Sequence, residues 1–331
     1  MKIAVIALTD GGKELAERIC DLQPECLVDT RDLPVFDKLA DHWKHEVDAI
    51  VCIMAAGIVV RGLSTLCRDK VQDPCVLVLD EKGRFVISLL SGHLGGGNSL
   101  AIELAGKLGG QAVITTASDV TGHTALDLWA RKNQLFVEDS QKLTEKSAKL
   151  VNTGSLQIFT ELQYDSLPHD FKVVSRPDMA DLIVSGKIYK ENEALFLRPC
   201  FFTVGLGCNR GTSKEDFQAA VTELFTDEGL AENAICSFGS IDLKSDEQGM
   251  LDYTGQAERP IKFYAKEQLN GVEDVSSSAV VLAATGAKGV AEPAAVLAAE
   301  TELGSGKLIV RKRKWKDVTA AIAVKQIRLV A

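Results

Sequence analysis

Short apolar runs alternate with amphipathic runs along most of this 331-residue chain. The apolar runs are nearly continuous, which is typical of strands buried on both faces of a parallel sheet, and the amphipathic runs have helical spacing. In the first part of the chain we expect strands at residues 2–8, 48–54, 76–80, 84–89 and 112–116, and helices at 13–22, 36–46, 99–108 and 124–132. Residues 81–83 predict a hairpin turn. The pattern therefore predicts a mostly parallel sheet that helices cover on both faces.

The alternation weakens between residues 139 and 200 and resumes at residue 201. The weak segment has a charged helical run at 141–151 and short strand candidates at 156–160, 172–174, 182–185 and 195–198. Beyond it we expect strands at 201–206, 234–240, 261–264, 308–310 and 318–324, and helices at 214–225, 276–285 and 293–300. We therefore expect an α/β protein with two three-layer α/β domains, residues 1–138 and 201–331, joined by a small middle segment or linker module at 139–200.

The net charge of −9 makes nucleic acid and anionic membrane poor candidates as partners of the whole chain. The eight cysteines contain no C-x-x-C pair, so their spacing predicts neither a disulfide nor a metal site, and unpaired thiols suit a reducing cytoplasm. The apolar start, residues 1–8, is too short for a signal peptide, and the apolar stretch 49–60 is too short to cross a bilayer. We expect a soluble, cytoplasmic protein.

The most informative motif joins an expected strand to an expected helix: Ser91-Gly92-His93-Leu94-Gly95-Gly96-Gly97-Asn98. Three consecutive glycines cost backbone entropy that a simple connection does not need, and they let a ligand approach N–H groups at the start of a helix. His93 is the group in this turn that can move protons near neutral pH. A tight loop with a capping residue is the alternative, and we favour a ligand-binding or catalytic loop.

A second glycine-rich turn, Gly205-x-Gly207-x-x-x-Gly211-Thr212-Ser213, follows the apolar run that begins at residue 201. Its spacing is one residue too long for a dinucleotide fingerprint, and it lacks the lysine of a phosphate-binding P-loop. The residue types still suit an anion, because Thr212 or Ser213 can cap the helix and Arg210 can fork onto a carboxylate. A capped helix start with a solvated arginine explains these residues equally well.

Three further turns follow expected strands, and ligands bind beyond strand ends in open α/β sheets. They are residues 55–57 before Arg61, residues 115–119, and residues 285–292. Asp119 and Glu292 in these turns are candidate acids or bases, although such residues more often cap a helix or carry a first-turn charge. The basic run 311–314 is typical of a solvated strand edge.

Two ordered sets of motifs stand out together. The first comprises residues 54–61, Lys70, Asp73-Pro74, 86–96 and 115–119, and the second comprises residues 205–213, 242–244, Ser278 and 290–295. The first set resembles the amino-terminal domain of the cobalt-precorrin-5A hydrolase family, and the second resembles its carboxy-terminal domain. The resemblance covers nearly the whole chain. Residues 139–199 match poorly, and Asn209 stands where an arginine is expected, which removes one carboxylate contact.

The resemblance implies a hydrolase of anaerobic cobalamin biosynthesis. Such an enzyme opens the ring-A δ-lactone of cobalt-precorrin-5A with water and releases a two-carbon fragment as acetaldehyde, to give cobalt-precorrin-5B. Cobalt arrives in the substrate, so no cofactor and no protein metal site are expected, and neighbouring enzymes of the pathway are candidate partners. A non-catalytic protein that binds a tetrapyrrole or a nucleotide is the alternative.

For this chemistry we expect His93 to transfer protons, Asp119 to orient it, and the N–H groups of residues 95–98 to stabilise the oxyanion. Glu292 is a further candidate catalytic residue. Carboxylates of the large substrate, which we expect to lie between the two domains, suit the basic residues near these turns. The expected substrate-binding residues are Gly57, Arg61, Ser91, Gly95, Gly96, Gly97, Asn98, Thr116, Ser118, Gly207, Arg210, Gly211, Thr212 and Lys288.

Overall fold

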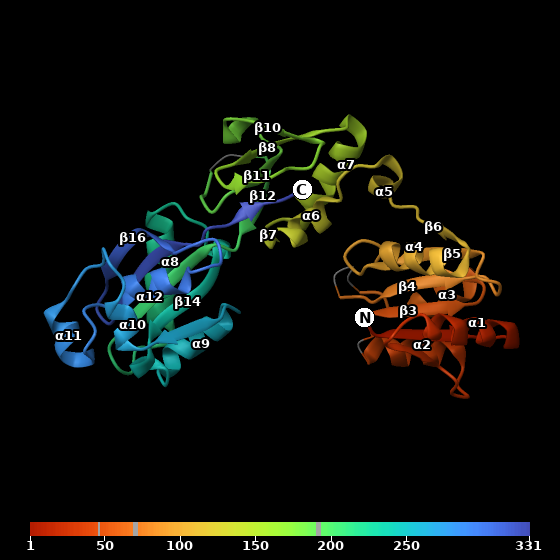
Figure 1. The fold of residues 1–331 in the computed structure, drawn as a ribbon, viewed down its shortest axis with the longest axis horizontal. Coiled ribbons are helices and arrows are strands. Elements are labelled where there is room, and N and C mark those ends of the chain that lie inside the picture. Colours follow the sequence, from red (N-terminus) through yellow and green to blue (C-terminus); the bar gives the residue numbers. More distant parts are fainter. Residues whose placement is uncertain (46, 69–71, 190–192) are drawn as a thin grey trace. The chain divides into compact units, whose positions relative to one another are not determined.

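The computed structural model describes residues 1–45, 47–68, 72–189 and 193–331, and the chain divides into two compact units, Met1–Leu128 and Trp129–Ala331 (Figure 1). The boundary between the units lies before residue 138, where we expected the amino-terminal domain to end. Glu46, at the end of an expected helix, and Lys70, in one family-like motif, lie outside the described residues.

The first unit contains a six-stranded sheet in the order β2-β1-β3-β4-β5-β6. Its strands are β1 (Ile3–Ala7), β2 (Cys26–Val28), β3 (Ala49–Ile53), β4 (Cys75–Leu79), β5 (Phe85–Leu90) and β6 (Gln111–Val113). Helices α1 (Asp10–Asp21) and α4 (Gly97–Leu108) cover one face, and α2 (Val35–Lys44) and α3 (Ala56–Leu63) cover the other. The strands are apolar on both faces because both faces are buried, and the expected three-layer arrangement is confirmed.

The hairpin between β4 and β5 reverses the direction of the chain within this sheet. Strand β4 pairs in parallel with β3, β5 pairs antiparallel with β4, and β6 pairs in parallel with β5. The carboxyl ends of β5 and β6 therefore lie at one edge of the sheet, and those of β1, β3 and β4 lie at the opposite edge. This reversal decides which of the expected site residues meet.

The residues expected to form a middle segment fold into a five-stranded sheet of the second unit, in the order β10-β8-β11-β12-β7. Its elements are α6 (Leu126–Lys132), β7 (Leu135–Val137), α7 (Ser140–Thr153), β8 (Leu156–Thr160), β10 (Phe171–Val173), β11 (Leu182–Val184) and β12 (Leu195–Pro199). The chain end returns to this part of the unit, because β18 (Arg328–Leu329) pairs with β9 (Gln163–Tyr164) in a separate two-stranded sheet. The Trp129 indole also donates to the carbonyl oxygen of Val330 at 2.8 Å. The segment is therefore a folded module, and it begins before residue 139.

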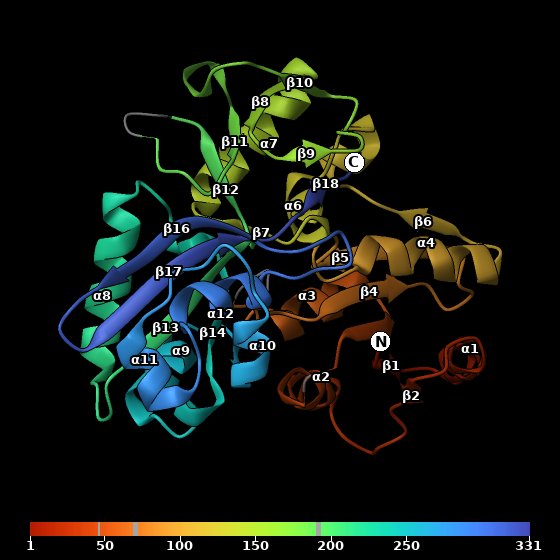
Figure 2. The same ribbon diagram turned by 60° about the vertical axis from the view of Figure 1, so that its left-hand side comes forward.

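The last sheet has the order β15-β14-β13-β17-β16, and Figure 2 shows its long edge strand β16 and the neighbouring β17 in blue. Its strands are β13 (Phe202–Cys208), β14 (Ile235–Ile241), β15 (Ile261–Tyr264), β16 (Lys307–Lys314) and β17 (Val318–Val324). Helices α8 (Lys214–Asp227) and α9 (Gln248–Gln256) pack on one face, and α12 (Ala291–Ala298) packs on the other. Short helices α5 (Ala117–Thr121), α10 (Lys266–Asn270) and α11 (Ala279–Thr285) lie in connections.

Helix α12 approaches this sheet closely because β13 carries Gly205. A Cβ at that position would lie 1.8 Å from the carbonyl oxygen of Ala291. Gly239 on β14 has the same role, since its Cβ would lie 2.6 Å from the carbonyl oxygen of Ala294. The absent side chains let the helix backbone rest directly on the two central strands.

The structure corrects the expectation that the cysteines are unpaired. Cys20, in the last turn of α1, and Cys26, the first residue of β2, form a disulfide with their Cα atoms 4.8 Å apart. The tight connection from helix to strand brings the two side chains together. The two cysteines are six positions apart in the sequence, so they do not form a C-x-x-C pair. The disulfide removes one ground for the expected cytoplasmic location. Within the described ranges, no helix is both long and apolar enough to span a membrane.

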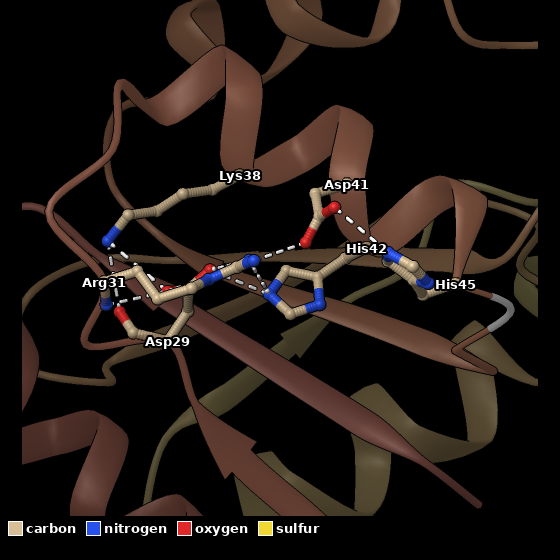
Figure 3. A network of polar contacts seen from close by, with 6 residues as sticks. All are labelled: Asp29, Arg31, Lys38, Asp41, His42 and His45. Atoms are coloured by element: carbon tan, nitrogen blue, oxygen red, sulfur yellow. Dashed lines mark hydrogen bonds and ion pairs between the residues drawn. The ribbon is translucent and has the colours of Figure 1, made fainter.

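A buried carboxylate fixes the loop that follows β2. The fully buried side chain of Asp29 accepts hydrogen bonds from the backbone N–H of Arg31 at 3.0 Å and from its guanidinium at 2.6 Å, and Nε2 of His42 lies 2.8 Å away (Figure 3). The Lys38 ammonium donates to the carbonyl oxygen of Asp29 at 3.2 Å. Burial raises the pKa of Asp29, but the hydrogen bonds from Arg31 and His42 outweigh burial and hold this pKa well below its usual range.

We expect Asp29→Asn to destabilise the first unit by about 2–3 kcal/mol at neutral pH, because it leaves the buried donors around it without a charged acceptor. A carboxylate whose folded pKa is lowered stabilises the fold above its unfolded pKa of about 4, and this contribution is lost as the pH falls toward the folded pKa. In urea unfolding, the difference between wild type and variant should therefore shrink in acid. The control, Asp41→Asn, removes a partly exposed partner of Arg31 and should cost less than about 1 kcal/mol. Equal costs for the two substitutions would contradict this account.

Candidate active site

The loop of residues 91–98 connects β5 to α4, and several of its backbone N–H groups donate hydrogen bonds to carbonyl oxygens of the loop itself. Three N–H groups donate to carbonyl oxygens of the loop itself: Gly96 to His93 at 2.9 Å, Gly97 to Ser91 at 3.3 Å, and Asn98 to Gly92 at 2.8 Å. In this arrangement the loop carbonyls occupy these three N–H groups, and their expected role at an oxyanion stays a prediction. Of residues 95–98, only Gly95 keeps an N–H group with no acceptor among the described residues.

The glycines are needed because this loop packs against itself. A Cβ at Gly92 would lie 2.4 Å from Oδ1 of Asn98, and a Cβ at Gly95 would lie 2.6 Å from Cβ of Ser91. Ser91 has a φ of +50°, in the left-handed region, and its buried hydroxyl has no hydrogen-bond partner within the described part of the chain. Such strain persists only where the surrounding structure holds a residue in place. The packed loop thereby fixes the position of His93.

His93 lies between two carboxylates. Its Nε2 is 2.9 Å from Oδ2 of Asp119, and its Nδ1 is 3.5 Å from Oδ1 of Asp127. The hydroxyl of Ser118 is 3.3 Å from the same Nε2. The expected proximity of His93 and Asp119 is confirmed, because the carboxyl ends of β5 and β6 share one edge of the sheet.

Asp127 was not among the expected site residues. It lies in the first turn of α6, the next helix along the chain from the 115–119 turn. An acidic residue that begins the helix after a candidate site turn is the sequence signal that points to it. A first-turn charge is common, so that signal is weak without the structure.

An amide joins the His93 loop to the 115–119 turn. Nδ2 of Asn98, in the first turn of α4, donates to Oδ2 of Asp119 at 2.7 Å and to Oγ1 of Thr116 at 3.2 Å. Asp119 therefore interacts with the imidazole and with the amide through one oxygen. Five expected residues form one hydrogen-bonded centre: His93, Asn98, Thr116, Ser118 and Asp119.

The two carboxylates favour the protonated imidazole. The hydrogen bond with Asp127 contributes most to raising the pKa of His93 above its usual value, partial burial opposes it, and Asp119 raises it further. Burial raises the pKa of Asp127, but the hydrogen bond and charge of His93 outweigh burial, so this pKa is lowered. The side chain of His93 is 17% exposed and that of Asp119 is 39% exposed. The more exposed carboxylate and the imidazolium can therefore exchange protons with a bound molecule.

Gly57 lies away from this centre. It is in the first turn of α3, beyond the carboxyl end of β3, and the β4–β5 reversal places that end at the opposite edge of the sheet. Arg61, later in the same helix, has an exposed side chain. The roles expected for these two residues in substrate binding remain predictions.

In the second unit, the turn after Gly207 forms a capped helix start. Arg210 forms an ion pair with Asp246 and donates to the carbonyl oxygen of Leu243 at 2.6 Å. The N–H of Gly211 donates to Oε1 of Glu247 at 2.7 Å. Ser213, rather than Thr212, caps α8 by accepting from the N–H of Asp216 at 3.2 Å. Any anion that binds Arg210 must therefore compete with Asp246.

Glu292 is a buried carboxylate of α12 that joins three backbone segments. It accepts hydrogen bonds from the N–H and hydroxyl of Ser276 at 2.6 and 3.0 Å and from the N–H of Lys312 at 2.9 Å. Burial raises the pKa of Glu292, but these donors and the charge of Arg311 outweigh burial and lower it. Lys288 is exposed before α12. The catalytic role expected for Glu292 and the binding role expected for Lys288 remain predictions.

Two family models match the chain over the regions that carry these residues. The model described as cobalamin synthesis G N-terminal matches residues 37–119, and the model described as cobalamin synthesis G C-terminus matches residues 202–323. The first range contains His93 and Asp119, and the second contains Glu292. Fold and sequence together define a cobalamin-synthesis protein built from these two domains.

Individual relatives identify the family more narrowly than the two domain models do. A cobalt-precorrin-5A hydrolase from Priestia megaterium is 32% identical over 83% of this chain and 78% of its own, and one from Salmonella typhimurium is 31% identical over 97% of both chains. A solved structure of CobE, a protein from the cobalamin (vitamin B12) biosynthetic pathway, is 34% identical over 37% of this chain and 89% of its own, with a TM-score of 0.36. This chain belongs to the cobalt-precorrin-5A hydrolase family.

We expect Asp127→Asn to lower the pKa of His93, because it removes the largest contribution that raises it. The raised pKa stabilises the fold below the unfolded value of about 6.5, and this contribution is lost as the pH rises through the folded pKa. The variant should therefore lose stability on the acidic side and approach wild type at alkaline pH. NMR titration of the imidazole protons measures the shift. An unchanged His93 titration would show that Asp127 does not act on it.

Proposed function

We propose that this chain hydrolyses cobalt-precorrin-5A, opening its ring-A δ-lactone with water and releasing acetaldehyde to give cobalt-precorrin-5B. Membership of the family supports the reaction, and the observation that carries it to particular residues is the imidazole of His93 held between Asp119 and Asp127. The cobalt belongs to the substrate, and we propose no cofactor. We also propose that the protein works in the cytoplasm beside other enzymes of the pathway.

Lactone opening needs a proton acceptor for water and a proton donor for the departing ring oxygen. Water attacks the lactone carbonyl, the C–O bond of the ring breaks, and a carboxylate and a hydroxyl group result. In the proposed step Asp119 accepts the proton from water, and the imidazolium of His93 donates one to the ring oxygen. The N–H of Gly95 and the hydroxyl of Ser118 are the donors near His93 that suit the developing oxyanion.

Release of acetaldehyde needs the same groups in a second proton transfer. The hydroxyl freed by lactone opening loses its proton, its C–O bond becomes the aldehyde carbonyl, and the C–C bond to the macrocycle breaks with its electrons passing to the macrocycle. His93, neutral after the first step, accepts the hydroxyl proton and is restored to the imidazolium. The macrocycle carbon takes up the proton that Asp119 accepted from water, so Asp119 returns to its carboxylate form. Asp127 keeps Nδ1 of the ring oriented throughout. A carrier protein would have no use for an imidazole held in this way.

We expect His93→Ala to lower the rate of acetaldehyde release by about 10²-fold or more, because it removes the group that transfers the proton in both steps. The affinity for substrate and the free energy of unfolding should change little, since the loop is held mainly by its own backbone hydrogen bonds. The assay measures acetaldehyde formed from cobalt-precorrin-5A, and His45→Ala, at an exposed histidine of the same unit, is the matched control. A variant that releases acetaldehyde at the wild-type rate would move the catalytic role to another residue.

A further inference from the structure

The second unit contains a pocket of about 320 Å³ at the carboxyl ends of β13 and β14, beside the start of α12. Gly207 at the end of β13 contributes to its floor, and the backbone carbonyl of this residue accepts from the hydroxyl of Thr319 at 3.3 Å. A Cβ at Gly207 would lie 2.6 Å from that hydroxyl. The pocket thus depends on Gly207, which belongs to the second glycine-rich turn. Arg210 of the same turn does not line the pocket.

One wall of this pocket is apolar and open to solvent. It is formed by α11, whose side chains Val280, Val281 and Ala284 line the pocket. Val280 is 80% exposed. A valine this exposed beside a concave surface offers apolar area to a ligand, because burying it would remove that area from water.

Another part of the pocket lining is basic. Lys312 and Lys314 of β16 line the pocket together with Lys244 and Lys316, and Asp317 is the carboxylate among the lining residues. Lys244 pairs with Glu247 at 3.3 Å and Lys316 pairs with Asp317 at 3.7 Å. The ammonium groups of Lys312 and Lys314 pair with no carboxylate in the part of the chain that the structure describes. These two lysines leave positive charge at the pocket that no acidic side chain neutralises.

A strand irregularity and a buried carboxylate set the position of these lysines. The register of β16 against β17 shifts between Val310 and Arg313, while Arg313 turns to Asp227 and Glu228 of the α8 end at 2.6 and 3.0 Å. Glu292 holds the N–H of Lys312 and, through Ser276, the segment that leads to α11. The carboxylate of Glu292 therefore fixes both the strand that carries the lysines, β16, and the segment that leads into α11. The basic run 311–314 is more than a solvated strand edge.

We propose that this pocket binds one edge of a tetrapyrrole macrocycle, with Lys312 and Lys314 holding its carboxylate side arms and α11 covering its apolar periphery. The proposal rests on the proposed function, whose substrate carries acetate and propionate groups around an apolar ring. A volume of about 320 Å³ suits an edge of such a ring rather than the whole of it. Charge complementarity favours this occupant over an uncharged ligand.

The test uses the full chain and two stable probes, dicyanocobyrinic acid, a cobalt corrin with free carboxylates, and its fully esterified form, which is neutral. Equilibrium dialysis measures the binding of each by its corrin absorbance. The Lys312→Ala/Lys314→Ala double variant should bind the acid about tenfold or more weakly than wild type, and the wild-type affinity should fall as salt is added. Lys307→Ala, at the start of the same strand and outside the pocket, is the matched control and should bind normally.

The esterified probe separates charge recognition from apolar contact. It should bind wild type about tenfold or more weakly than the acid, and the double lysine substitution should not change its affinity. Val280→Asp, at an exposed position, should weaken the binding of both probes. The proposal is overturned if the double variant binds the acid as tightly as wild type, if acid and ester bind equally, or if wild type binds neither. If acetaldehyde is still released from cobalt-precorrin-5A in any of these cases, the proposed function stands and only the binding site is wrong.

Discussion

The reversal of the chain at the β4–β5 hairpin is the constraint on which the chemistry of the first unit depends. In a wholly parallel sheet, the ends of β3, β4, β5 and β6 would share one edge. The antiparallel pairing of β5 with β4 instead sends the His93 loop and the 115–119 turn to the other edge, away from Gly57. The histidine thereby contacts Asp119 of α5, just beyond β6, and Asp127 of α6. A short turn at residues 81–83 decides which loops are neighbours.

Buried and partly buried carboxylates stabilise each unit at places where separate segments of the chain meet. Asp29 joins the β2–α2 loop to α2, Asp127 holds the ring of His93, and Glu292 joins α12 to β16 and to the segment before α11. A buried charge is costly unless hydrogen bonds and opposite charges surround it, so each of these residues restricts its partners to one arrangement. The lowered pKa of each carboxylate shows that the surrounding donors outweigh the effect of burial.

The two units present different chemistry. The first presents an imidazole with a carboxylate beside each ring nitrogen, which is suited to proton transfer. The second presents a pocket lined by an apolar helix and by lysines without carboxylate partners among the described residues, which is suited to an anionic ligand. Arg210, for which the sequence favoured an anion ligand and a solvated arginine equally, forms an ion pair with Asp246. Lys312 and Lys314 belong to a basic run that is typical of a solvated strand edge. Their ammonium groups pair with no carboxylate within the described ranges of the chain.

The apolar runs predicted most strands within one or two residues, because a strand buried on both faces must be apolar throughout its length. Helix α3 was missed because Ala56–Leu63 is itself apolar and continues the run of β3 without a polar face. The short β7 was missed because its three residues show no pattern, so a small module and a linker both stayed open for the middle segment. Pairing of β7 with β12 completes its sheet, and the returning chain end pairs with β9 in a separate two-stranded sheet.

The sequence by itself determined the α/β class, the family, and the candidacy of His93 and Asp119, since these depend on local pattern and on the chemistry of single residues. Only the tertiary structure decided that Asp127 is the second partner of the imidazole and that Cys20 and Cys26 are bonded. It also decided that the loop carbonyls occupy the N–H groups of Gly96 and Gly97. Each of these outcomes depends on the distance between groups in three dimensions. Strand direction, turns and side-chain packing set those distances, and spacing along the chain does not encode them.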